Sequence, residues 1–250
     1  MSDYEWVATG PQTRALLRAW PAMVLFSGGF DSTAALHWAL GKHAQVRALT
    51  LDYGQPHRDA EVYAARTIAA RRGVDCRVAC TADAFPRAGL LAGVKDNREG
   101  NGQDDAVLPM RNLVFLSLAA SYAMVCWPDA AKIEIIVGCC REDADGFPDC
   151  CQGFIRSATE TLTLGAGRAI RVCAPWVKMP KARIREALGS PDATEDLAES
   201  WSCYRGTACG TCHACVVRAL AFADHEDKCL APRATGGDVD RARRLSDAAR

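Results

Sequence analysis

Residues 21–33, Pro-Ala-Met-Val-Leu-Phe-Ser-Gly-Gly-Phe-Asp-Ser-Thr, decide the fold of this chain. The first six form a short, continuous apolar run, which is typical of a strand buried on both faces. A helix is expected from Ser32 onward. Two glycines between them leave no Cβ in the way, so backbone N–H groups can close around an anion that the positive helix end also attracts. The stretch predicts a strand, an anion-binding loop and a helix.

The loop sequence at residues 27–32, Ser-Gly-Gly-Phe-Asp-Ser, narrows the choice of anion. It has neither the Lys of a P-loop kinase nor the third Gly of a dinucleotide-binding fingerprint. It resembles the pyrophosphate loop of the ATP-pyrophosphatase (PP-loop) superfamily, whose members adenylylate a substrate oxygen and release pyrophosphate. The resemblance implies ATP as a ligand, bound by Phe26, Ser27, Gly28, Gly29, Phe30, Asp31, Ser32, Thr33, Leu51 and Asp52.

The rest of the chain alternates strands and helices. Strands are expected at residues 46–51, 73–78, 133–138 and 171–174, and helices at 59–72, 113–125, 153–164, 181–188 and 216–223. This order indicates an α/β fold with a doubly wound, Rossmann-like parallel sheet, in which ligands bind beyond the carboxyl ends of the strands. We also expect a short helix at 13–20, a lid-like loop at 92–106 and a loop at 141–151.

The composition excludes several classes of protein. The chain has 250 residues, 49% of them hydrophobic, which is enough for a large core. Its 30 basic and 30 acidic residues cancel, which argues against nucleic acid as the main ligand. No apolar run reaches the ~20 residues of a membrane span, and the acidic start is unlike a signal peptide. We therefore expect a cytoplasmic protein that contacts no membrane.

Four of the thirteen cysteines form a cluster near the C-terminus: Cys203, Cys209, Cys212 and Cys215. Their tandem Cys-x-x-Cys spacing lets neighbouring thiolates reach one ion, and four soft ligands suit tetrahedral zinc. Buried apolar cysteines and an iron–sulfur cluster are the alternatives. A closed four-thiolate site leaves no open position, so a metal held there is expected to be structural. We divide the chain into an extension (1–20), a nucleotide-binding domain (21–200), a zinc-binding segment (201–230) and a charged tail (231–250).

Beyond the loop, nearly the whole chain resembles the 7-cyano-7-deazaguanine synthase family of the queuosine pathway. The resemblance lies in Asp-Tyr-Gly-Gln-Pro-His at 52–57, Arg-Asn-Leu at 111–113, Phe-Pro-Asp-Cys at 147–150 and Trp-Ser-Cys-Tyr at 201–204. The last run, leading into the cysteines, separates this family from thiouridine synthases, GMP synthetases and NAD synthetases. The resemblance implies an ATP-dependent C–N ligase that adenylylates 7-carboxy-7-deazaguanine and converts it, with ammonia, through the amide to 7-cyano-7-deazaguanine.

The resemblance also implies roles for individual residues. Asp31 would orient the loop or a magnesium ion, Lys181 would place a cation on the phosphates, and Arg111 would neutralise a carboxylate or the α-phosphate. Asp149 would accept two parallel N–H donors of a guanine-like edge while Phe147 stacks on the ring. Helix capping by Asp31 and turn formation by Asp149 remain alternatives. The set is completed by Tyr53, Gln55, His57 and Asn112, with ATP, zinc and magnesium as cofactors and a homodimer as the expected assembly.

Three departures from the family pattern lie near the expected pocket. Met110 stands where glycine is usual, Pro180 directly precedes Lys181, and Arg183 replaces a common acidic residue. They leave open a second function, that of a defence-associated relative that passes the same activated acid to an amine of a protein. A zinc-ribbon module that binds nucleic acid without catalysis is a third function, which the neutral charge and the intact phosphate loop disfavour.

Overall fold

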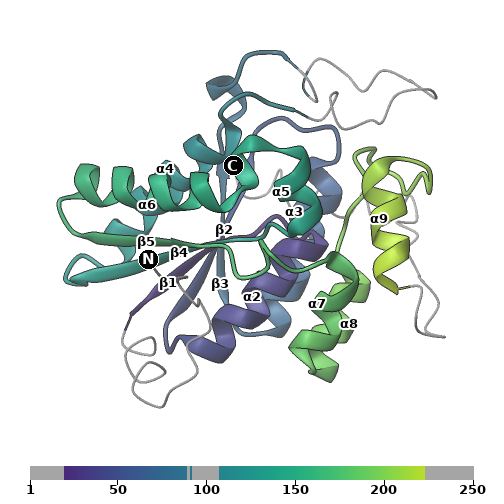
Figure 1. Cartoon of the computed structure of the whole chain (residues 1–250), viewed down its shortest axis with the longest axis horizontal. Coiled ribbons are helices and arrows are strands. Elements are labelled where there is room, and N and C mark those ends of the chain that lie inside the picture. The colour runs from purple at the N-terminus through teal and green to yellow at the C-terminus, as the bar shows by residue number, and fades with distance from the viewer. Residues whose placement is uncertain (1–19, 89–90, 92–106, 223–250) are drawn as a thin grey trace.

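The computed structural model describes residues 20–88, 91 and 107–222 (Figure 1). The lid-like loop expected at 92–106, the tail at 231–250 and the helix at 13–20, apart from Trp20, lie outside the described residues. Five parallel strands form one sheet in the order β3-β2-β1-β4-β5. They are β1 (Ala22–Leu25), β2 (Val46–Asp52), β3 (Asp75–Cys80), β4 (Lys132–Val137) and β5 (Ala169–Cys173). The predicted doubly wound parallel sheet is confirmed.

Helices cover both faces of this sheet (Figure 1). Successive side chains of β1 alternate between the faces. Met23 and Leu25 pack with α4 (Arg111–Cys126) and α6 (Gln152–Ala166), whereas Val24 packs with α2 (Phe30–Lys42) and α3 (Arg58–Arg71). The strand order reverses between β1 and β4, and ligands of such sheets bind in the crevice at that reversal. The remaining helices are η1 (Ala82–Ala84), α5 (Arg141–Gly146), η4 (Pro148–Cys150), α7 (Lys181–Leu188), α8 (Pro191–Glu199) and α9 (His213–Phe222).

The prediction of a loop at 141–151 is wrong in part, because α5 and η4 fall within these residues. Helix α5 has only six residues, too few to show a hydrophobic period, and its start is fixed by Asp143, whose Oδ2 accepts the Cys140 N–H at 3.0 Å. Helix α8 was not predicted either. It begins with a capping Ser190 followed by Pro191, a pair of start signals that the sequence contained.

Asp196 joins α8 to α2 and to the C-terminal end of α3. Its fully buried carboxylate accepts hydrogen bonds from Arg71 Nη1 (2.8 Å) and Arg72 Nε (2.5 Å) and lies 2.8 Å from His37 Nε2. Burial by itself raises the pKa of Asp196, but the hydrogen bonds from Arg72 and His37 outweigh burial and hold that pKa below its usual range. A buried charge is tolerated here because it is fully paired.

Arg218 joins the cysteine-bearing segment to the rest of the molecule. This buried side chain on α9 donates to the carbonyls of Leu197 (3.0 Å) and Ala198 (2.7 Å) and to Ser200 Oγ (2.7 Å). The last carbonyls of a helix have no partner within the helix, so the guanidinium satisfies the C-terminal end of α8. The position of α9 is thereby fixed against α8.

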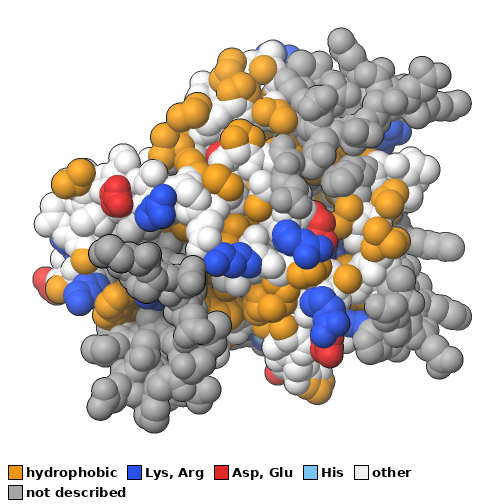
Figure 2. Space-filling view, viewed as in Figure 1, with side chains coloured by type: hydrophobic (Ala, Val, Ile, Leu, Met, Phe, Trp, Pro, Cys, Tyr) orange, Lys and Arg blue, Asp and Glu red, His pale blue; other side chains and the backbone are white. Residues whose placement is uncertain are grey.

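The surface carries no dominant charge on the face that Figure 2 draws. Lys and Arg side chains stand there singly or in small groups between apolar and uncharged surface. Among the described residues, no helix is both long and apolar enough to span a membrane.

Gly138, which follows β4, packs against the start of α2. A Cβ added there would lie 2.5 Å from Asp31 C and Ser32 N, and backbone atoms cannot rotate away. We expect Gly138→Ala to lower the free energy of unfolding by about 3 kcal/mol, measured by urea denaturation. The control is Gly165→Ala in α6, where an added Cβ meets nothing within 4 Å and stability should be kept or rise by up to about 1 kcal/mol. Equal stability of Gly138→Ala and the wild type would contradict this packing.

Candidate active site and metal centre

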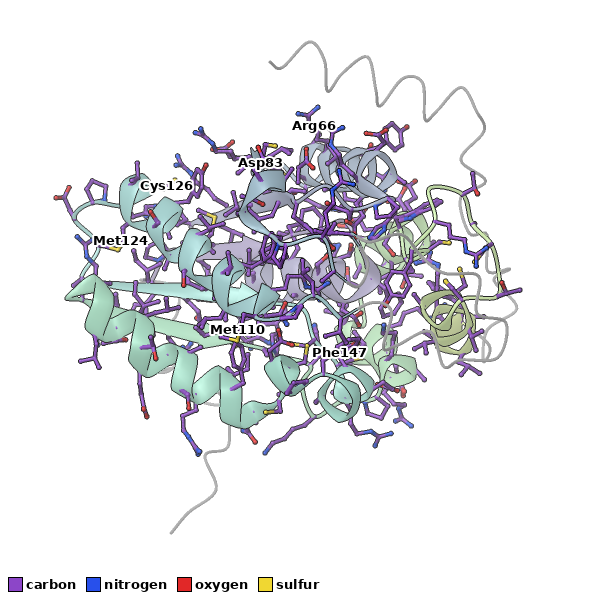
Figure 3. The ribbon with its side chains drawn as sticks, turned by 90° about the horizontal axis from the view of Figure 1, so that it is seen from above. Arg66, Asp83, Met110, Met124, Cys126 and Phe147 are labelled. Atoms are coloured by element: carbon purple, nitrogen blue, oxygen red, sulfur yellow. The ribbon has the colours of Figure 1, made fainter. Side chains whose placement is uncertain are left out.

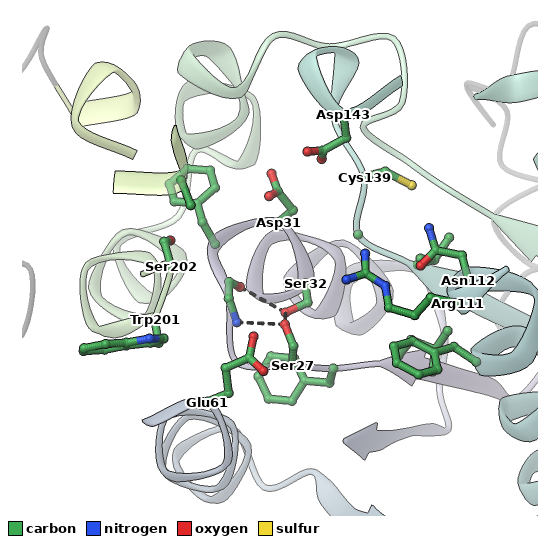
Figure 4. A pocket seen from close by; sticks show the side chains of 18 of the residues that line it. Ser27, Asp31, Ser32, Glu61, Arg111, Asn112, Cys139, Asp143, Trp201 and Ser202 are labelled. Carbon is green, nitrogen blue, oxygen red and sulfur yellow. Dashed lines mark hydrogen bonds between the residues drawn. The ribbon is translucent and has the colours of Figure 1, made fainter. Parts of the chain in front are cut away.

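The loop between β1 and α2 folds around its own hydroxyl groups. Ser27 Oγ accepts the Gly29 N–H (3.2 Å) and lies 3.1 Å from Ser32 Oγ, which donates to the Gly29 carbonyl (3.0 Å) (Figure 4). Gly28 has a φ of 78°, and a Cβ there would lie 2.5 Å from Ala65 N. Only glycine fits this position, so the loop lies directly against α3 while it leads into the N-terminus of α2.

A cleft with a volume of about 240 Å³ opens beside this loop. Among the ligand-binding residues expected from the sequence, those that line it are Phe26, Ser27, Gly29, Phe30, Asp31, Ser32, Leu51, Tyr53, His57, Arg111, Asn112, Phe147 and Lys181. Those that do not line it are Gly28, Thr33, Asp52, Gln55 and Asp149. Residues from between positions 26 and 181 of the sequence therefore meet at one place.

The expected residues outside the cleft are engaged in local structure. Asp52 Oδ2 lies 2.6 Å from Arg58 Nε. Thr33 is fully buried in α2. Asp149 Oδ2 accepts the backbone N–H of Asn112 at 3.2 Å, and its carbonyl accepts the Asn112 side chain at 3.1 Å. Asp149 thus supports the start of α4. It lies behind Asn112, which lines the cleft.

Several lining residues were missed by sequence reasoning. Glu61 lies four residues after His57, a spacing that places both on one face of α3 and could have indicated the pair. Asp143 gave no signal, because its helix was expected to be a loop. Trp201 and Tyr204 were recognised only as family markers, yet both line the cleft. The backbone N–H of Trp201 donates to the Gly28 carbonyl at 2.8 Å.

One end of the cleft holds a carboxylate–lysine pair. Lys181 Nζ lies 2.7 Å from Asp31 Oδ2. The backbone N–H of Lys181 donates to the Glu142 carboxylate. Burial raises the pKa of Asp31 to about 6, because the Lys181 cation offsets only part of the desolvation and Asp143 adds a second negative charge. Although burial opposes it, Asp31 holds the pKa of Lys181 above its usual range. Both members of the pair are therefore charged at neutral pH.

The other end holds a guanidinium among aromatic rings. Arg111 stands over the Phe115 ring with Cζ 5.9 Å from its centroid, and within the described ranges no carboxylate lies in salt-bridge distance of it. Burial raises the pKa of Tyr53 and of Tyr204 to about 12, so both phenols stay neutral. Figure 4 shows Arg111 and Asn112 across the cleft from Asp31. A guanidinium without a carboxylate partner suits an anionic ligand at this end of the cleft.

The four clustered cysteines lie at the edge of the cleft wall. Their Sγ atoms are all within 4.8 Å of one another, with Cys203 and Cys209 3.6 Å apart and Cys209 and Cys215 4.0 Å apart. Tetrahedral zinc with Zn–S bonds of about 2.3 Å requires sulfur atoms roughly 3.8 Å apart, so the donor set fits zinc.

The fold and the cleft define a class: an α/β protein of the doubly wound type, with an anion-binding loop between its first strand and the next helix. A family model described as queuosine biosynthesis protein QueC matches residues 21–226. The 7-cyano-7-deazaguanine synthase of Laribacter hongkongensis is 38% identical over 212 residues (81% of this chain, 90% of the relative). That of Chromobacterium violaceum is 36% identical over 214 residues (81% and 89%). The chain belongs to the QueC family of 7-cyano-7-deazaguanine synthases.

Membership confirms the prediction of an enzyme, an ATP-dependent C–N ligase of the 7-cyano-7-deazaguanine synthase type. A solved structure from Methanocaldococcus jannaschii is described as a predicted subunit of tRNA methyltransferase. Its alignment covers 72% of this chain and 85% of the chain in that structure. The TM-score is 0.45 and the identity 16%, and no functional argument follows from that likeness.

Met110, which is labelled in Figure 3, directly precedes α4. It adopts a left-handed conformation with φ 62° and ψ 11°. Its side chain is exposed (61%), so it gains little packing to offset a strain of about 1–2 kcal/mol. We expect Met110→Gly to raise the free energy of unfolding by about 0.5–1 kcal/mol in denaturant titrations, after the larger entropy of an unfolded glycine is subtracted. Met110→Ala keeps the Cβ and should gain nothing; an equal gain would contradict the strain.

Removing one thiolate of the cysteine cluster should release the metal and weaken the fold. We expect Cys212→Ser to lose bound zinc, measured by metal analysis of the purified protein, and to lower soluble yield, because metal binding is coupled to folding. Cys80→Ser, at an exposed cysteine outside the cluster, is the matched control and should keep both. Full zinc content and normal solubility of Cys212→Ser would contradict a four-thiolate site.

Proposed function

We propose that this enzyme uses ATP to convert 7-carboxy-7-deazaguanine to an acyl adenylate, and then uses ammonia and a second ATP to form the amide and 7-cyano-7-deazaguanine. The observation that carries the proposal is that the phosphate loop, the Lys181 cation and the Arg111 guanidinium line one cleft. The names of the curated relatives support the same activity.

The loop end of the cleft suits the departure of pyrophosphate. A carboxylate is a poor electrophile, and adenylylation gives it AMP as a leaving group. The pyrophosphate that leaves ATP carries concentrated negative charge, which preorganised donors stabilise where it develops. The hydroxyls of Ser27 and Ser32 and the N-terminus of α2 offer such donors. Lys181 adds a cation beside them.

The same end fits a magnesium ion. Asp31 Oδ1 is buried and has no hydrogen-bond partner among the described residues, and a ligand oxygen of Asp143 lies within 4.8 Å of the Asp31 carboxylate. Carboxylate oxygens are the ligands that magnesium prefers, together with phosphate oxygens. Bound there, magnesium would neutralise charge on the departing pyrophosphate. In the proposal Asp31 and Asp143 hold it.

The aromatic end suits the deazapurine acid. Arg111 would hold the substrate carboxylate, or the α-phosphate once the adenylate has formed. Phe147 lines this region and provides a flat apolar face for a heterocycle. Asp149 does not line the cleft, and its Oδ2 accepts the Asn112 N–H, so in the proposal Asp149 acts by holding Asn112 against the substrate.

The departures from the family pattern do not alter the lining of this cleft. Arg183 is exposed and pairs with Glu186 one helical turn away (3.0 Å). Met110 points to solvent and keeps a backbone conformation that glycine would adopt. Pro180 precedes α7 in an extended conformation. This supports ammonia, rather than an amine of a protein, as the acceptor of the activated acyl group.

Asp31→Ala and Lys181→Ala are expected to reduce AMP formation by at least about a hundredfold, because each removes charge from the site of pyrophosphate departure. AMP release with ATP, 7-carboxy-7-deazaguanine and ammonium would be measured by chromatography, with circular dichroism to show that the fold is kept. Lys178→Ala removes an exposed lysine three residues away and should leave the rate unchanged. Normal turnover in either cleft variant would remove that residue from the proposed site.

The mass of the product from the wild-type reaction distinguishes the candidate functions. A nitrile supports the proposal, whereas an amide alone, or an acyl group attached to an added protein, supports the conjugating relative. Absence of substrate-dependent AMP release would overturn both enzymatic functions.

A further inference from the structure

One carboxylate that lines the cleft has no part in the chemistry described so far. Glu61 on α3 faces the cavity with its side chain 13% exposed. Figure 4 shows its carboxylate turned into the cleft beside Ser27. A carboxylate repels phosphate groups and accepts hydrogen bonds, so a ligand must present N–H or O–H donors to this part of the wall.

Two bridging residues connect Glu61 to the aromatic end of the cleft. Gln55 accepts the Tyr53 N–H on its Oε1 (3.0 Å) and donates through its Nε2 to Glu61 Oε2 (2.9 Å). His57 Nδ1 lies 3.1 Å from the Tyr204 carbonyl, and His57 Nε2 lies 3.5 Å from Glu61 Oε1. Both tyrosines line the cleft. Glu61 is therefore linked to each of these aromatic residues through one side chain.

The carboxylate of Glu61 keeps acceptor capacity for a ligand. Each carboxylate oxygen can accept two hydrogen bonds. Among the described residues, Oε2 accepts one from Gln55, and Oε1 has His57 as its neighbour. The 3.5 Å from His57 Nε2 to Oε1 is longer than the roughly 2.7–3.2 Å of an N–H···O hydrogen bond. One position therefore remains on each oxygen, and two parallel donors of a ligand can occupy both.

A charge of the opposite sign lies at the same end of the cleft. Burial raises the pKa of Tyr53 to about 12, and Arg111 lowers that pKa while Glu61 raises it, so both charges act on one tyrosine. A flat heterocycle with an anionic group at one end and N–H donors at the other is complementary to such a pair. In 7-carboxy-7-deazaguanine the carboxylate is on the five-membered ring, and N1–H and the 2-amino group are on the far edge of the six-membered ring.

We infer that Glu61 is a specificity-determining residue, which accepts hydrogen bonds from N1–H and the 2-amino group of the deazapurine acid while Arg111 holds its carboxylate. The inference rests on the proposed function, and it gives Glu61 the role that the sequence suggested for Asp149. An analogue without the 2-amino group leaves one acceptor of the carboxylate without a donor and binds more weakly. The ribose hydroxyls of ATP are another source of donors, but the links from Glu61 to two tyrosines favour the heterocycle.

The test compares 7-carboxy-7-deazaguanine with its analogue that lacks the 2-amino group, using the full-length protein. Exchange of labelled pyrophosphate into ATP gives a KM for each compound and for ATP. With the wild type, the KM of the analogue should be about tenfold to a hundredfold higher than that of the acid. Glu61→Gln places an amide N–H where the ligand donates. It should raise the KM of the acid at least about tenfold, lower the ratio of the two KM values to about threefold or less, and keep the KM of ATP and the maximal rate within about threefold.

Glu186→Gln is the matched control, because the exposed Glu186 on α7 does not line the cleft and its loss should leave every KM unchanged. An unchanged KM ratio in Glu61→Gln, or a rise in the KM of ATP alone, would overturn the inference while leaving the proposed function intact. No acid-dependent exchange by the wild type would overturn the proposed function and this inference with it. If Glu61→Gln fails to fold, Glu61→Asp, whose carboxylate is one methylene shorter, should lower the ratio in the same way, and an unchanged ratio there would overturn the inference.

Discussion

Two contacts between backbones hold the phosphate loop in place. Gly28 lies so close to α3, and Gly138 so close to the start of α2, that a Cβ on either would come within 2.5 Å of backbone atoms. Backbone at van der Waals contact cannot adjust as a side chain can. The N-terminus of α2 is thus fixed between α3, which contacts the loop before it, and the residue that follows β4.

The cysteine segment is part of the cleft wall rather than an appendage. Cys203, one of the four clustered thiols, stands between Trp201, which bonds to the Gly28 carbonyl, and Tyr204, whose carbonyl holds His57. The buried Arg218 ties the helix that follows to α8. A metal bound by the thiolates would therefore organise one side of the nucleotide cleft, although it has no coordination position left for a substrate.

What the sequence predicted was local. The strands and the phosphate loop follow from short apolar runs and glycines, and the cysteine cluster from its spacing. The six-residue α5 left no periodic signal, so Asp143 could not be placed. The hydrogen bond between Asp149 and Asn112 joins segments 37 residues apart, and no local pattern reports which way such a side chain turns. Glu61 was within reach of the helical spacing from His57, but its contact with Gln55, like that of His57 with Tyr204, arises only on folding.

The distribution of charge in the cleft is compatible with the two activations that the proposed function requires. At one end three carboxylates, Asp31, Glu142 and Asp143, surround the single cation of Lys181, so a polyphosphate bound there would gain from an accompanying metal cation. At the other end Arg111 has no carboxylate partner in the described structure. In the proposed reaction, a carboxylate or the monoanionic phosphate of an acyl adenylate gains more there than a neutral amide does. Under the proposed function the amide would therefore be retained chiefly by contacts to its ring system, and the aromatic wall would matter to the second activation as the guanidinium does to the first.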